Sequence, residues 1–223
     1  MSQECPERDD RVSKRVGTSV TVVGVESEMS ERDRLRSLVA DYCLENGVAT
    51  LTLRSVSDAV GTNNRMLLYY FGSKEEMIAE ALAEAKAQFP GIENAFDTLA
   101  DRDMELVDRL QVAWRSIAAP SNIAYLRLFF EVFGLAVREP DRYAHFIDGG
   151  RSWPRRVASV LRAEGVPTPD ARSMARELVA LWRGLQFDLL ANGNRKAVEA
   201  MHDDAAGRFA ARVALSVQPA VRV

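Results

Sequence analysis

Apolar residues recur three and four positions apart along this chain from residue 30 to about residue 216. No stretch within that span alternates apolar and polar residues as a half-buried β-strand does. Prolines interrupt the pattern at residues 90, 120, 140, 154, 167 and 169, where we expect the joints between helices. The spacing predicts an all-α protein without an internal repeat or a coiled-coil heptad.

Three helices with well-marked ends open the helical part of the chain. Ser30 and Thr52 can cap the first two through their side-chain oxygens, and Gly47 and Gly61 suit the turns that end them. Two short helices joined by a glycine-containing turn, and braced by a longer one, form a helix-turn-helix unit. The expected helices cover residues 30–46, 52–60 and 63–70.

The remaining helices are expected to form a larger body. Ser73 can cap a fourth helix that runs to about Phe89, and Pro90-Gly91 then closes that segment. The segment over residues 122–138 is apolar almost all round, so we expect it to be buried on most sides. Further helices are expected over residues 106–117, 155–164, 169–191 and 194–216.

The chain is accordingly expected to have three parts. Residues 1–29 mix charges of both signs without helical spacing, which is typical of a disordered N-terminal arm. Residues 30–74 are expected to form the helix-turn-helix domain, and residues 75–218 a second, helical domain.

The charge of the whole chain gives no attraction to nucleic acid. The 29 basic and 32 acidic side chains leave a formal net charge of −3. Between Thr50 and Lys74, however, three basic side chains stand against Asp58 alone, namely Arg54, Arg65 and Lys74. Any contact with a polyanion is therefore expected to come from this local cationic segment.

The sequence contains no segment suited to membranes or export. No uncharged run approaches the ~20 apolar residues that a membrane-spanning helix needs. The N-terminal residues begin with acids and lack the apolar core of a signal peptide. We therefore expect a cytoplasmic protein with no membrane contact, in which Cys5 and Cys43 are unpaired thiols.

Residues suited to catalysis or metal binding are few. The two histidines, His145 and His202, and the two cysteines have none of the spacings of a zinc site. Glycine-rich phosphate loops, dinucleotide fingerprints and nucleophile elbows are also absent from the sequence. The only hints of an enzyme are His145 near Asp148 and Arg151 near the Asp141 loop. We expect no metal, no cofactor and no enzymatic activity.

One pattern in the N-terminal part is specific. Five positions follow the order glycine, threonine, glycine, aromatic run and lysine at the helix ends: Gly47, Thr52, Gly61, Tyr69-Tyr70-Phe71 and Lys74. In spacing and in capping residues this pattern resembles the TetR family of bacterial transcriptional regulators. One position departs from the family pattern, because Leu68 stands where a tyrosine is usual, three residues before Phe71.

The resemblance implies binding to double-stranded DNA through the third helix. Arg65 in its first turn suits a bidentate contact with guanine and Asn63 or Asn64 one with adenine, each worth ~1–3 kcal/mol of discrimination. Hydroxyl and cationic side chains near helix ends are expected to hold phosphates. The predicted DNA-contacting residues are Thr52, Arg54, Thr62, Asn63, Asn64, Arg65, Tyr69, Tyr70 and Lys74. Arg32, Arg34 and Arg36 at the start of the first helix could add phosphate or minor-groove contacts, as could Lys14 and Arg15 in the arm, where such contacts are not the favoured interpretation.

The resemblance also implies that the second domain binds a small-molecule effector and forms a homodimer through its last two long helices. Contacts with the partner are expected to include Val179, Gln186, Phe187, Ala205 and Ala210. The effector is expected to be largely apolar, because few buried charges are available to recognise an ion. The aromatic pocket candidates, each of which fits a plain role in the core equally well, are Trp114, Tyr125, Phe129, Phe133, Phe146, Trp153 and Trp182.

These expectations combine into a repressor that its effector releases from a palindromic operator. Only Gly72-Ser73 separates the third helix from the fourth, so a ligand that moves the fourth helix would change the spacing of the two recognition helices in the dimer. The alternatives are a ligand-independent or activating regulator of the same fold, a DNA-binding protein of low sequence specificity, and an enzyme.

Overall fold

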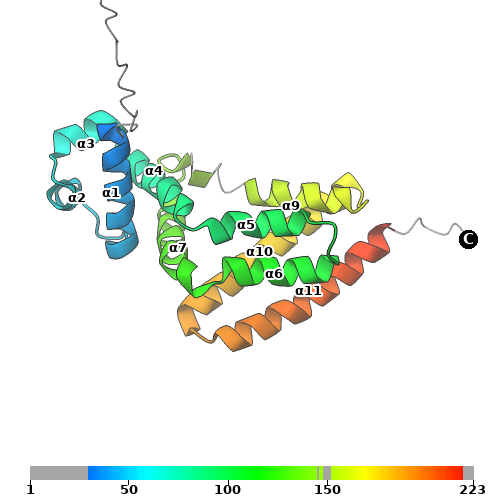
Figure 1. The fold of residues 1–223 in the computed structure, drawn as a ribbon. Coiled ribbons are helices and arrows are strands. Elements are labelled where there is room, and N and C mark those ends of the chain that lie inside the picture. Colours follow the sequence, from blue (N-terminus) through cyan, green and yellow to red (C-terminus); the bar gives the residue numbers. More distant parts are fainter. Residues whose placement is uncertain (1–29, 145, 148–151, 218–223) are drawn as a thin grey trace, which may run out of the picture.

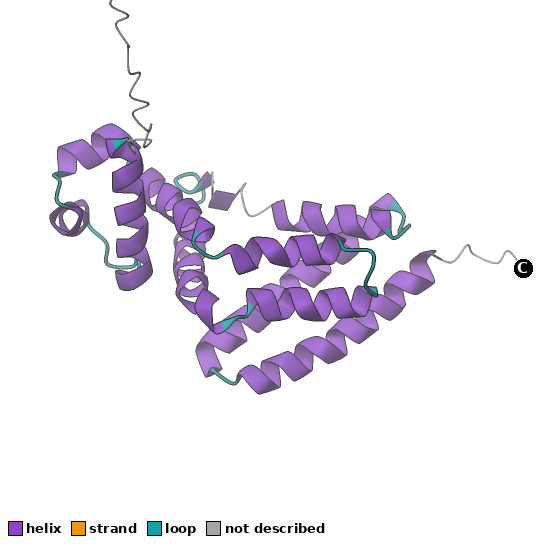
Figure 2. Ribbon diagram, viewed as in Figure 1, coloured by secondary structure: helices purple, strands orange, loops and turns teal. Residues whose placement is uncertain are grey.

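The computed structural model describes residues 30–144, 146–147 and 152–217, and every regular element in those ranges is helical (Figure 2). The all-α prediction is therefore confirmed. No helix among these residues is both long enough and apolar enough to cross a membrane. The predicted arm over residues 1–29 lies outside the described residues, as do His145, Asp148 and Arg151.

The N-terminal unit consists of α1 (Glu31–Asn46), α2 (Leu53–Val60) and α3 (Asn64–Phe71), which lie together at one end of the molecule (Figure 1). Each helix begins at a polar side chain that accepts a hydrogen bond from the backbone N–H three residues later. These capping residues are Ser30, Thr52 and Asn63, at 3.1, 3.1 and 3.0 Å respectively. The predicted helix starts are correct because such caps satisfy N–H groups that the helix leaves unpaired.

The remaining helices form the body, and they share one continuous apolar core with the N-terminal unit (Figure 1). A short 3-10 turn, η1 (Pro120–Asn122), precedes the helix that the sequence predicts from residue 122. The body helices are α4 (Lys74–Ala87), α5 (Pro90–Ala100), α6 (Leu106–Ile117), α7 (Ile123–Arg138), α9 (Ser152–Ala163), α10 (Thr168–Asn192) and α11 (Arg195–Val217).

Two helices begin at positions that the prolines did not reveal. α4 ends at Ala87, close to the predicted end, but Pro90 is also the first residue of α5, which the sequence analysis did not expect. Proline is favoured there, since the first helical N–H has no partner in the helix anyway. Similarly, Pro154 lies in the first turn of α9, which begins at Ser152 rather than at Arg155.

Two body helices hold the N-terminal unit in place. α4 packs along α1, and α7 contacts both of these helices. Glu131 of α7 accepts a hydrogen bond from the backbone N–H of Val48 at 2.7 Å. Gly47, whose φ is +70°, makes room for this carboxylate, because a Cβ atom there would lie 2.6 Å from Oε2 of Glu131. Glycine at this position therefore serves both the turn and the contact with the body.

Candidate nucleic-acid interface and ligand cavity

The turn between α2 and α3 fixes how α3 is presented. Gly61 has φ +72° and ends α2 in the left-handed conformation. The hydroxyl of Ser57 donates to Oδ1 of Asn64 at 2.9 Å and so ties α2 to the first turn of α3. Val56, Val60 and Leu67 are buried beneath the two helices. The opposite side of α3 is consequently left facing solvent.

Several predicted DNA-contacting side chains are exposed on α2 and on that side of α3. Arg65 is exposed, and no carboxylate of the described residues pairs with it. Arg54 is also exposed and lies 3.9 Å from Asp58. Tyr69 is 77% exposed, although an aromatic ring of its size is ordinarily covered in a folded protein. These three side chains are free to reach a molecule in the solvent.

The two asparagines have part of their hydrogen-bonding capacity engaged. Oδ1 of Asn63 accepts from the N–H of Met66, and Oδ1 of Asn64 accepts from Ser57. The Nδ2 amide groups of Asn63 and Asn64 form no hydrogen bond among the described residues, so they can donate to a base. Each amide oxygen still carries a second lone pair for a base.

The remaining predicted contacts lie where α2, α3 and α4 meet. The ammonium of Lys74, at the start of α4, lies 3.4 Å from the carbonyl oxygen of Leu51 and is therefore next to Thr52. Thr52 is exposed, while Thr62 and Tyr70 are half-buried. Lys74 and the N-terminus of α2 thus form a compact donor-rich region, which is the chemistry that binds phosphate.

The arginines of α1 are engaged within the chain. Each forms an ion pair with a carboxylate: Arg32 with Glu80 at 2.7 Å, Arg34 with Glu31 at 2.7 Å, and Arg36 with Glu84 at 2.8 Å. The expectation that these guanidinium groups are available for phosphate is therefore not met. The charges of Arg32 and Arg36 instead help to fasten α1 to α4, whereas Arg34 pairs within α1.

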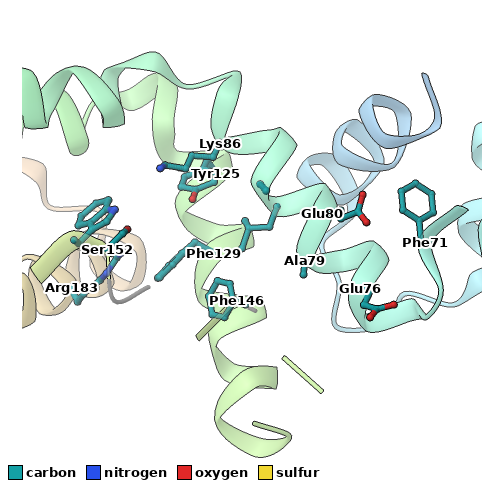
Figure 3. A pocket seen from close by; sticks show the side chains of 13 residues that line it. Phe71, Glu76, Ala79, Glu80, Lys86, Tyr125, Phe129, Phe146, Ser152 and Arg183 are labelled. Atoms are coloured by element: carbon teal, nitrogen blue, oxygen red, sulfur yellow. The ribbon is translucent and has the colours of Figure 1, made fainter. Parts of the chain in front are cut away.

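A cavity of about 570 Å³ lies between the N-terminal part of the body and α10 (Figure 3). α4 contributes the largest share of its wall, and Phe71, the last residue of α3, also reaches it. Its lining residues are mostly apolar: Phe71, Glu76, Ala79, Glu80, Leu82, Ala83, Lys86, Tyr125, Phe129, Phe146, Ser152, Trp153 and Arg183.

Residues 43–81 match the family model described as bacterial regulatory proteins, tetR family. The matched segment contains the last turn of α1, all of α2 and α3, and the first part of α4. The N-terminal unit is therefore similar to the DNA-binding segment of the tetR family, and the match ends within α4.

Solved structures share the fold over most of the chain. The multidrug binding protein EbrR, crystallised with ethidium, is 21% identical, with a TM-score of 0.64 over 80% of this chain and 98% of its own. A transcriptional regulator from Rhodococcus sp. RHA1 is 19% identical, with a TM-score of 0.63 over 81% and 96%. GusR of Salmonella enterica is 17% identical, with a TM-score of 0.62 over 81% and 95%. A search of curated proteins finds no match.

The aromatic residues predicted for the effector pocket fall into two groups. Tyr125, Phe129, Phe146 and Trp153 line the cavity. Phe133 stacks on Phe129 with ring centroids 6.2 Å apart, but it is 48% exposed and does not line the cavity.

Trp114 and Trp182 lie outside the cavity, so the predicted set of pocket residues has to be corrected at these two positions. Both are fully buried against His202. The Trp182 indole N–H donates to Nε2 of His202 at 3.1 Å, and the Trp114 ring stacks on the imidazole at 5.0 Å. Burial lowers the pKa of His202, which suits the neutral form that accepts this bond. These tryptophans therefore fill the core between α6, α10 and α11.

The cavity contains a charged residue that the sequence analysis missed. The guanidinium carbon of Arg183 lies 4.0 Å from the ring centroid of Phe129 and 4.1 Å from that of Trp153. Burial lowers the pKa of Arg183 to about 10, so the group remains charged at neutral pH. A signal was present in the sequence, because Arg183 shares a helix face with Val179 and Gln186, which are both buried.

Among the described residues, no group of three His, Cys, Asp or Glu side chains is arranged to hold a metal ion. The thiol of Cys43 is buried in the N-terminal unit, and burial together with Glu131 raises its pKa to about 12. Such a thiol is a poor nucleophile at neutral pH.

Proposed function

We propose that this TetR-family regulator is a sequence-specific repressor that binds a palindromic operator as a homodimer and is released by a largely apolar effector. The observation that carries the proposal is the position of Phe71. This residue ends α3, the recognition helix, and also lines the cavity in the body. An occupant of the cavity therefore touches the DNA-reading element itself.

A chain of contacts supports this coupling. Glu80 lines the cavity and holds Arg32 through both carboxylate oxygens, each 2.7 Å from the same guanidinium nitrogen. Nε of Arg32 in turn donates to the carbonyl oxygen of Tyr70 at 3.3 Å, near the end of α3. A displacement of α4 by a ligand is thus transmitted to α3 through polar contacts as well as through the covalent link.

In the proposed complex the first turn of α3 reads bases. Arg65 binds guanine through its free guanidinium fork, and the amides of Asn63 and Asn64 bind neighbouring bases. Phosphates are held by the side chains that surround this turn: Thr52, Arg54, Thr62, Tyr69, Tyr70 and Lys74.

The proposed dimer forms through α10 and α11. Phe187 on α10 is 60% exposed and Met201 on α11 is 47% exposed, which leaves apolar surface for a second copy to cover. The expected contact set needs correction here. Val179 and Gln186 are buried within the chain and face its own core, so they are not available to a partner.

Selection of bound DNA from a random pool by the purified protein tests the proposed function. Two recognition helices related by a two-fold axis select a palindrome whose half-sites lie about 34–36 Å apart. Enrichment of such a palindrome is the expected result. Failure to enrich any sequence, or enrichment of a single half-site alone, would contradict the proposal.

A further inference from the structure

We propose that the effector carries a carboxylate, which Arg183 binds, on a flat apolar body that fills the rest of the cavity. This inference rests on the proposed function in treating the cavity as the effector site. It adds the charge of the ligand and the residue that recognises it.

Arg183 has the geometry of an anion receptor. Phe129 and Trp153 lie against its guanidinium group, and one N–H donates to Oε1 of Gln186 at 2.9 Å. A guanidinium group has five N–H donors in one plane, so its edge retains donors after this single bond. A carboxylate matches that edge with two parallel hydrogen bonds.

Arg183 has no counterion among the described residues, whereas Lys86 and Glu80 of the cavity wall are each paired. Lys86 forms an ion pair with Glu93, and Glu80 forms one with Arg32. Glu76 is exposed to solvent, and it lies with Glu80 at the end of the cavity opposite Arg183 (Figure 3). A half-buried cation without a counterion favours a ligand that brings one.

The remaining wall of the cavity selects the body of the ligand. Phe129 and Phe146 lie between Arg183 and Ala79 of α4 (Figure 3), and they offer aromatic surface to a planar group. A volume of about 570 Å³ lies within the range of pockets for small organic molecules. When its carboxylate is held at Arg183, the aromatic body of the ligand therefore points towards α4, the helix that follows α3 in the chain.

Calorimetric titration of the full chain with three probes of equal shape tests this inference. The probes are naphthalene-2-carboxylate, naphthalene-2-carboxamide and 2-naphthylmethylammonium. A charge-assisted bidentate contact predicts that the carboxylate binds about tenfold more tightly than the amide. The ammonium compound is expected to bind more weakly than either.

Two substitutions assign the preference to Arg183. Arg183→Met is expected to lower carboxylate affinity to that of the amide and to leave amide affinity unchanged, which also reports that the cavity is intact. Arg183→Lys, which keeps the charge but not the planar fork, retains part of the preference. Should the methionine variant not fold, the lysine variant and the three probes on the unmodified chain still decide the question.

Arg156→Met is the matched control. Arg156 also lies over an aromatic ring, 3.9 Å from the centroid of Phe96, but it is paired with Glu93 at 2.6 Å and does not line the cavity. Its removal is expected to leave the carboxylate preference unchanged.

The inference is overturned if the amide binds as tightly as the carboxylate, if the ammonium compound binds best, or if the preference survives in Arg183→Met. It is also overturned if none of the probes binds at millimolar concentration. These measurements need no DNA, so failure here leaves the operator selection unaffected. Conversely, a random pool that yields no operator would contradict the proposed function without changing the ligand preference.

Discussion

The N-terminal unit and the cavity differ in how their side chains are brought together. The predicted DNA contacts of α2, α3 and the start of α4 come from one continuous stretch, residues 52–74. The cavity is lined by residues from α3, α4, α7, α9 and α10, as well as by Phe146. Caps and turns determine the first arrangement locally, whereas the second depends on how distant helices pack. A short motif is therefore sufficient to recognise the former and not the latter.

The aromatic residues of the two regions also differ in their surroundings. Tyr69 in the N-terminal unit is exposed, and Trp182 in the body is fully buried. An exposed aromatic ring contributes little to the stability of the isolated chain, whereas a buried one contributes to its core. The contrast predicts opposite effects of substitution in the two regions.

The largest expected effect is on folding stability. Trp182→Ala removes a buried ring and leaves His202 without its donor, so we expect the free energy of unfolding to fall by about 3–5 kcal/mol. Tyr69→Ala is expected to change it by less than about 0.5 kcal/mol while weakening operator binding. Urea unfolding of both variants measures the difference. Equal losses of stability would contradict the assignment of the two rings.

The next effect concerns DNA sequence preference. Arg65→Ala is expected to lose about 1–3 kcal/mol of discrimination at one base pair of each half-site. Lys74→Ala should weaken binding to all sequences and reduce the slope of log K against log salt by about one. Binding titrations on the selected operator and on single-base variants measure both quantities. If the two variants behave alike, the division between base-reading and phosphate-binding residues is wrong.

A smaller effect is expected on communication between the two regions. Glu80→Gln weakens the contact with Arg32, so we expect the coupling free energy between ligand and operator to fall by about 1 kcal/mol. Glu84→Gln is the matched control, because Glu84 pairs with Arg36 on the same helix but does not line the cavity. Operator titrations with and without ligand give the coupling energy of each variant. If Glu84→Gln loses as much coupling free energy as Glu80→Gln, or more, the contact between Glu80 and Arg32 does not carry the coupling.

The smallest expected effect is a pH dependence of stability. Burial lowers the pKa of His202 in the folded state, so the unfolded chain binds the proton more readily. Stability is therefore expected to fall as the pH drops below about 6.5, the ordinary pKa of histidine. His202→Gln, which keeps an acceptor for Trp182, should lose this part of the dependence. The free energy of unfolding is measured between pH 8 and pH 5 for the unmodified chain and for His202→Gln. The same pH dependence in both proteins would contradict the prediction.

The sequence predicted the N-terminal helices well because their ends are chemically marked. Ser30, Thr52 and Ser73 each accept the expected backbone hydrogen bond, and Gly61 adopts the expected left-handed turn. α5 was missed because Pro90 suits both the end of one helix and the start of the next. Local chemistry alone does not distinguish these two roles.

The cavity was only partly predictable for a different reason. Trp153 and Trp182 are the same residue type on apolar helix faces, yet one lines the cavity and the other contacts His202 in the core. Their roles depend on which helices surround them. The pairing of Arg32 and Arg36 was equally hidden, because Glu80 and Glu84 lie more than forty residues away in the sequence.

The central claim is that an occupant of the cavity opposes DNA binding by α3. Titrating the naphthalene probe that binds the cavity most tightly into the complex of the protein with its selected operator tests this claim most directly. The account predicts that the probe raises the operator Kd, and that the operator raises the Kd of the probe by the same factor. A probe that occupies the cavity and leaves the operator Kd unchanged would contradict it.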